Sequence, residues 1–221
     1  MKLMKKILMV IAVIILIVGV WILRNVMIFK KLESNLKPYE EATNYYIKMY
    51  MRDSNQVYET YRKENRYATK IRILPSNGVK ERKLMCYGNG ETFNTYINAD
   101  EKKVAQLNSV GVSIPSPATV VNVFEGMTAL EYLKMATFST IATEDWNGKD
   151  CYKIMLRYSP NVMYMTEPDG TINPENFYGY FEKETGLMLK FGMNEYEYRF
   201  NSVTDNDLKE PNVENYEVME N

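Results

Sequence analysis

Residues 44–74, NYYIKMYMRDSNQVYETYRKENRYATKIRIL, carry the pattern that decides the fold. From Tyr45 to Met51 every second residue is apolar, and such a period of two is typical of a half-buried strand. Asp53-Ser54-Asn55 predicts a turn, and further strands are expected near residues 56–62 and 66–74. The stretch therefore predicts three consecutive antiparallel strands.

The same alternation continues along the chain with short connections. Strands are expected near residues 81–87, 91–97, 103–107, 151–158, 177–183, 187–191 and 195–200. Residues 118–141 have helical features instead, including a capping box formed by Thr128 and Glu131. The acidic residues 205–221 are expected to lie irregularly along the surface or to fray. This order predicts one α+β domain, a curved antiparallel sheet whose inner face is covered by helices.

An apolar run precedes this domain. Residues 7–23, ILMVIAVIILIVGVWIL, contain no polar side chain and span about 26 Å as a helix. We therefore expect a basic tail at 1–6, a transmembrane anchor at 7–29 and a juxtamembrane segment at 30–43. The competing interpretation is a cleaved signal peptide. The run is longer than the usual apolar region of about 7–15 residues, and no small-residue cleavage site follows it, so an uncleaved anchor is favoured.

The charges flanking the run are nearly balanced. Lys2, Lys5 and Lys6 precede it, whereas Arg24 and a few lysines follow it. A short basic tail normally stays in the cytoplasm, and long following domains are translocated largely regardless of charge. We expect a single-pass protein of the cell membrane whose residues 32–221 are extracytoplasmic.

Charge and composition exclude several function classes. Six of the 27 basic residues and none of the 28 acidic residues precede residue 32, so the remaining chain carries a net charge of −7. A nucleic-acid partner is not expected, because phosphate binding requires a basic face. The absence of histidine removes the His-dependent catalytic triads and imidazole metal sites. Cys86 and Cys151 could pair or could be two buried thiols.

The remaining candidate chemistry is weak. Met49-Tyr50-Met51 and Met163-Tyr164-Met165 could offer thioethers to Cu(I), but residues two apart on a strand share a face and are simply core neighbours. Asp205 and Asp207 are the only motivation for a carboxylate hydrolase. No nucleotide-binding or nucleophile motif is present. We therefore expect no enzyme activity, no cofactor and no metal.

Four short sequence segments resemble those of one known superfamily. They are residues 61–67 (YRKENRY), 87–96 (YGNGETFNTY), 146–154 (WNGKDCYKI) and 181–187 (FEKETGL). Together with the order of elements, they resemble the periplasmic lipoprotein-carrier (LolA/LolB-like) superfamily over residues 44–216, followed by an acidic tail at 217–221. The resemblance implies an open half-barrel of antiparallel strands wrapped around helices, with an apolar concave face for acyl chains. A chain fixed by a helix cannot shuttle across a periplasm, so binding near the membrane or sensing is expected.

The leading hypothesis is a membrane-tethered extracytoplasmic module that binds a lipid, lipopeptide or other hydrophobic ligand in a half-barrel cavity. The alternative is an envelope sensory or protein-interaction domain with a closed core and no small ligand. Candidate partners are therefore the membrane, a lipid or lipopeptide, and an envelope protein. The candidate cavity residues are chosen only because they are expected on the apolar side of their strand or helix. They are Ile47, Met49, Met51, Ile71, Ile73, Met85, Tyr87, Phe93, Phe124, Leu133, Phe138, Ile154 and Leu156.

Overall fold

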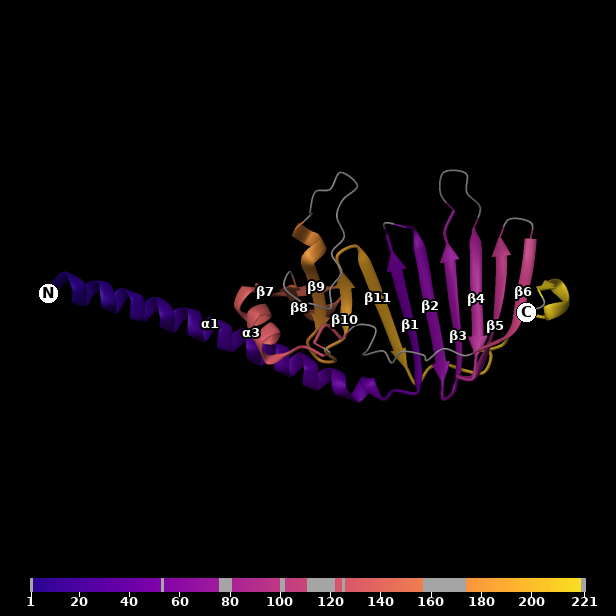
Figure 1. The fold of residues 1–221 in the computed structure, drawn as a ribbon, viewed down its shortest axis with the longest axis horizontal. Coiled ribbons are helices and arrows are strands. Elements are labelled where there is room, and N and C mark those ends of the chain that lie inside the picture. The colour runs from indigo at the N-terminus through magenta and orange to yellow at the C-terminus, as the bar shows by residue number, and fades with distance from the viewer. Residues whose placement is uncertain are drawn as a thin grey trace. The chain divides into compact units, whose positions relative to one another are not determined.

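The computed structural model describes residues 2–52, 54–75, 81–99, 102–110, 122–124, 126–156 and 174–219. Residues 111–121 and 157–173 lie outside this part. They include the start of the expected helical stretch and the Met163–Met165 pair. The described residues form an α+β structure with a long N-terminal helix, a 12-stranded open sheet and one further α-helix, which confirms the predicted fold class (Figure 1).

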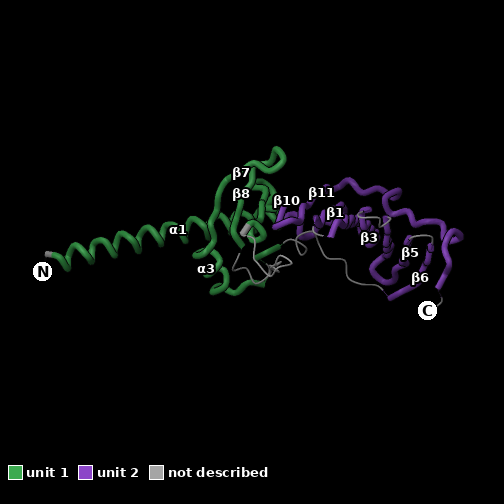
Figure 2. The backbone as a smooth tube through the Cα atoms, turned by 90° about the horizontal axis from the view of Figure 1, so that it is seen from above, with its two compact units in different colours: residues 1–37, 121–188 green, residues 38–120, 189–221 purple. Residues whose placement is uncertain are grey.

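The chain divides into two compact units (Figure 2). Unit 1 contains residues 1–37 and 121–188, and unit 2 contains residues 38–120 and 189–221. The predicted half-barrel segment, residues 44–216, therefore contributes to both units. The order of strands in the sheet is β12-β6-β5-β4-β3-β2-β1-β11-β10-β9-β8-β7. Among the strand pairings described, the one between β12 and β6 is parallel.

Unit 1 is built on the helix α1, Lys2–Glu40. It also contains α3 (Ala129–Phe138), β7 (Ile141–Trp146), β8 (Lys149–Met155), the 3-10 turn η1 (Pro174–Phe177) and β9 (Tyr178–Glu182). The predicted capping box opens α3, because the Thr128 hydroxyl accepts a hydrogen bond from the Glu131 amide while the Glu131 carboxylate accepts one from the Thr128 amide. Strand β7 was not expected from the sequence.

The apolar part of α1 is exposed and its following part is buried. α1 is the one helix of the described residues that is long and apolar enough to cross a membrane. From Asn25 onward the helix buries four residues at intervals of four, three and four, which places them on one face. These residues are Asn25, Phe29, Leu32 and Leu36. The helix α1 therefore combines an exposed apolar segment with a second segment that is buried in the core of unit 1.

Unit 2 is an antiparallel meander completed by later strands. Its strands are β1 (Asn44–Met51), β2 (Gln56–Lys63), β3 (Arg66–Ile73), β4 (Arg82–Gly88), β5 (Thr92–Ala99), β6 (Lys102–Val110), β10 (Met188–Phe191, beginning at the last residue of unit 1), β11 (Asn194–Phe200) and β12 (Glu217–Met219). The 3-10 turn η2 (Val213–Asn215) precedes β12. The meander follows the ranges expected from the sequence.

The C-terminal segment was expected to lie irregularly along the surface or to fray, and the structure shows the first of these. Residues 203–216 pack against one face of the unit 2 sheet, where Val203 and Leu208 are buried in a cluster with Tyr46, Tyr87 and Tyr96. The expected acidic tail then begins with β12, which pairs with β6. Within the described part of unit 2, this face is therefore covered by the end of the chain and not by inserted helices. Two buried apolar residues, Val203 and Leu208, thus fix this acidic segment on the sheet.

Candidate functional site

The thirteen residues predicted to line one cavity are distributed over both units and over both faces of the sheet. In unit 1, Phe124, Ile154 and Leu156 are buried core residues, whereas Leu133 and Phe138 are exposed on α3. In unit 2, a first group of six lies on one face of the sheet, namely Ile47, Met49, Met51, Ile71, Ile73 and Phe93. Met85 and Tyr87 lie on the opposite face. The described residues therefore do not form the single predicted cavity.

The core of unit 1 is filled by the side chains of the chain itself. The Phe29 ring of α1 lies with its centroid 5.6 Å from that of Phe124 and 5.9 Å from that of Tyr132. Phe124 in turn lies 6.3 Å from Phe181 of β9. Because Phe29, Phe124 and Phe181 are all buried, α1 occupies the space beside the unit 1 strands.

A continuous row of apolar side chains crosses the other face of unit 2, which we call the apolar face. Each member is the direct cross-strand partner of the next, so their side chains point to the same side of the sheet. In the order β11-β1-β2-β3-β4-β5-β6, this apolar row is Tyr196, Met49, Tyr58, Ile71, Leu84, Ile97 and Val104. At about 4.8 Å per strand, seven strands give a row about 29 Å long.

No member of the apolar row is fully buried. Leu84 and Ile97, which are direct partners, are 36% and 42% exposed, and the remaining members are half-buried. The sequence prediction included Met49 and Ile71 but missed Leu84 and Ile97, because it placed the apolar side of β4 at Met85 and Tyr87. In β4 both parities are apolar, so alternation alone does not indicate which face each residue occupies.

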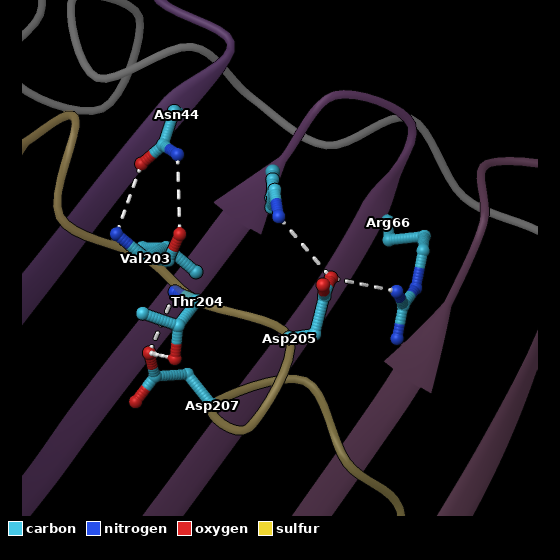
Figure 3. A network of polar contacts seen from close by, with 7 residues as sticks. Asn44, Arg66, Val203, Thr204, Asp205 and Asp207 are labelled. Atoms are coloured by element: carbon cyan, nitrogen blue, oxygen red, sulfur yellow. Dashed lines mark hydrogen bonds and ion pairs between the residues drawn. The ribbon is translucent and has the colours of Figure 1, made fainter.

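A network of polar contacts attaches the C-terminal segment to the opposite, covered face of the unit 2 sheet (Figure 3). The Asn44 side-chain amide donates to the Val203 carbonyl at 3.2 Å, and the Val203 amide donates to the Asn44 side-chain oxygen at 3.0 Å. The Asp205 carboxylate forms ion pairs with Arg66 at 3.1 Å and with Lys63 at 3.3 Å.

Asp207 completes this network. Its carboxylate accepts hydrogen bonds of 2.8 Å from both the backbone amide and the hydroxyl of Thr204, and these bonds lower the pKa of Asp207. Asp205 and Asp207 were the motivation for a hydrolase, and here both carboxylates have structural partners. Their contacts fix the C-terminal segment on the sheet.

A polar cavity of about 320 Å³ lies at one end of the unit 2 sheet, beside the C-terminal segment. Its walls combine aromatic rings with side-chain amides and two opposite charges, Arg66 and Glu210. The Glu210 carboxylate accepts hydrogen bonds from the Tyr96 hydroxyl at 2.6 Å and from the Asn94 amide at 2.9 Å. Burial, with a further contribution from this hydrogen bond to Glu210, raises the pKa of Tyr96. These contacts describe a small polar recess without an activated nucleophile.

The two cysteines are free thiols in different units. Cys151 is buried in unit 1, and burial raises its pKa to about 11. A protonated buried thiol is neither a nucleophile nor a metal ligand. Within the described ranges, no three His, Cys, Asp or Glu side chains are grouped so that they could hold a metal ion.

Comparison with known proteins gives no family for this chain. No model of a known protein family matches it, and no curated protein matches it. The resemblance to the lipoprotein carriers therefore stays a prediction from the four sequence phrases.

Proposed function

We propose that this protein is a membrane-tethered, extracytoplasmic binding module that takes a hydrophobic ligand on the apolar face of unit 2. The ligand class is an acyl chain of a lipid or lipopeptide. The observation that carries the proposal is the apolar row, which crosses seven strands without a charged residue and leaves Leu84 and Ile97 exposed.

The tether is supported by the way in which α1 packs. Residues 7–23 expose an apolar surface of the length needed to cross a bilayer, and residues 25–36 of the same helix belong to the core of unit 1. Processing between residues 25 and 29 would remove Asn25 from its bonds to Ala136 and Ser139, and processing between residues 29 and 36 would also remove Phe29 from its contacts with Phe124 and Tyr132. The packing therefore favours an uncleaved anchor over a signal peptide.

The ligand is supported by the contrast between the two faces of unit 2. An antiparallel sheet commonly packs one face and leaves the other to water, with polar side chains on the wet face. Here the C-terminal segment already covers one face, and the opposite face still carries an apolar row. Contiguous exposed apolar surface marks an interaction site, and acyl chains suit a long row that lacks charged side chains.

Photocrosslinking in intact cells tests the proposal with the full chain. The photoreactive residue p-benzoylphenylalanine replaces Ile97 in the apolar row, and in a matched chain it replaces Val110, an apolar residue 85% exposed at the end of β6. We expect an adduct with the mass of a lipid or lipopeptide at position 97 and not at position 110. Equal yields of lipid adduct at both positions would refute the ligand site.

The same experiment separates the alternative function. Strand β7 is an edge of the sheet, and residues 142–145 in it are exposed, so an envelope protein could pair with it. The same photoreactive residue at Thr143 probes this edge, and a discrete protein adduct there, with no lipid adduct at position 97, would favour an interaction domain. Protease treatment of intact cells tests the orientation, and full protection of residues 41–219 would contradict an extracytoplasmic location.

A further inference from the structure

The helix α3 exposes large apolar side chains on its outer face. Leu130 is 75% exposed, Leu133 49% and Phe138 54%, whereas Met135 and Ala136 on the other side are buried. Viewed down the helix axis, Leu130 lies about 60° from Leu133 and about 80° from Phe138, so the three together span the side opposite Met135 and Ala136. An outer face in contact with water is expected to be polar, whereas about half or more of each of these three apolar side chains is exposed.

The position of α3 along α1 is fixed by named contacts. The Asn25 side-chain amide donates to the carbonyl of Ala136 at 2.8 Å and to that of Ser139 at 3.0 Å. Further along α1, the Phe29 ring lies 5.9 Å from the Tyr132 ring. The two helices therefore run antiparallel, with the C-terminal end of α3 beside Asn25 (Figures 1 and 2).

This arrangement places the end of α3 at the level of the bilayer surface. The apolar run ends at Leu23, and Asn25 lies two positions further along the helix, a rise of about 3 Å. Each headgroup layer of a bilayer is about 5–7 Å thick, given a total thickness of about 40–45 Å and a hydrocarbon core of about 30 Å. The carbonyl of Ser139 and the neighbouring Phe138 thus fall within the headgroup layer when residues 7–23 span the core.

We propose that the C-terminal end of α3 contacts the bilayer crossed by α1, with Phe138 inserted at the boundary between headgroups and acyl chains. This inference rests on the membrane anchor of the proposed function and concerns a different surface from the apolar row. Arg24 is exposed on α1 next to Asn25, at the level where it suits anionic lipid headgroups. Asn25 fixes the depth of α3 in the bilayer, because its side-chain amide donates hydrogen bonds to two carbonyls at the end of that helix.

Fluorescence quenching by brominated lipids tests this contact. The full chain is placed in nanodiscs of phosphatidylcholine and phosphatidylglycerol, with or without bromine on the acyl chains. Three versions carry a single tryptophan, after replacement of Trp146 and, where needed, Trp21 by Phe. One keeps the native Trp21, one carries Phe138→Trp and one carries Leu130→Trp. Leu130 is the matched control, because it is exposed on the same helix but about 12 Å further along its axis.

We expect brominated lipids to reduce the emission of Trp21 and of the Phe138→Trp reporter by at least half, and that of the Leu130→Trp reporter by less than a fifth. Equal, weak quenching of the two α3 reporters beside a quenched Trp21 would overturn the α3 contact and leave the anchor intact. An unquenched Trp21 would overturn the anchor itself, and the α3 contact with it. A Leu133→Trp reporter, expected to be quenched to an intermediate degree, repeats the test if Phe138→Trp disturbs folding.

Discussion

Substitution of Phe29 tests whether α1, the proposed membrane helix, is also the core helix of unit 1. Phe29 is fully buried, and its ring contacts those of Phe124 and Tyr132. Replacing a buried Phe by Ala costs about 3–5 kcal/mol, from lost burial and from the cavity left behind. Because a whole domain is stabilised by about 5–15 kcal/mol, Phe29→Ala should remove about a fifth or more of the free energy of unfolding.

The assay is urea-dependent pulse proteolysis of the full chain in nanodiscs, followed by thermal unfolding in the same preparation. At about 2–4 °C per kcal/mol for a domain of 150–250 residues, the expected fall in Tm is about 6–20 °C. Met27→Ala is the matched control, since Met27 lies two residues away on α1 and is 65% exposed. Its free energy of unfolding should stay within about 0.5 kcal/mol of the original value.

A Phe29→Ala protein whose stability lies within 1 kcal/mol of Met27→Ala would refute the reasoning. That result would mean that residues 25–36 of α1 do not form the core of unit 1. It would also withdraw the argument that links core packing to an uncleaved anchor.

Three further outcomes are expected. Gly186 has a φ of +75°, and a Cβ on it would lie 2.3 Å from a backbone oxygen of α1, so Gly186→Ala should lower the free energy of unfolding by more than about 2 kcal/mol. Gly90 has a φ of +88° but no atom near its Cβ position, so Gly90→Ala should lower it by only about 1–2 kcal/mol. Urea titrations measure both values. The pKa of Asp207 is lowered by Thr204, so its stabilisation is present above the unfolded pKa of about 3.9 and is lost as the pH falls below it. Asp207→Asn should therefore flatten the loss of stability between pH 5 and 3, measured as urea midpoints. Iodoacetamide at pH 8 should leave Cys151 unmodified until the protein unfolds, as counted by mass spectrometry, because burial raises its pKa to about 11.

The strands were predictable because their signal is local. Alternation along residues 44–51 and 66–73 gives β1 and β3, and turn residues between them mark the ends. The capping box at Thr128 similarly fixed the start of α3, since a hydroxyl and a carboxylate three residues apart satisfy the first amides of a helix.

The apolar face was less predictable because register is not local. Shifting a strand by one residue moves all its side chains to the opposite face. In β4, Leu84 and Cys86 alternate with Met85 and Tyr87, so both faces of the strand are apolar. Only its pairing with β3, Ile71 opposite Leu84, assigns Leu84 to the apolar row. Residues 203–208 show the same limit, because Val203 and Leu208 reach a sheet that is distant in sequence.

The boundary of the anchor also depends on tertiary contacts. Residues 7–29 were predicted as the transmembrane anchor and residues 30–43 as a juxtamembrane segment. In the structure Asn25 and Phe29 are buried, and residues 30–40 continue the same helix. Hydropathy cannot distinguish a side chain that faces lipid from one that faces a protein core, because both surroundings are apolar.

With α1 as the proposed membrane anchor, one helix serves both the anchor and the core of unit 1, and this has a mechanical consequence. A flexible linker would let unit 1 move freely above the membrane, whereas a continuous helix rises only about 1.5 Å per residue and holds Asn25 within about 3 Å of the end of the apolar run. Depth in the bilayer and packing of unit 1 are then coupled, because a shift of α1 along its axis would break the bonds from Asn25 to Ala136 and Ser139. A version of the chain that begins after Phe29 would lose both the anchor and part of the core. Soluble production of this protein should therefore retain residues 24–40 and replace exposed apolar positions of the run, instead of deleting α1.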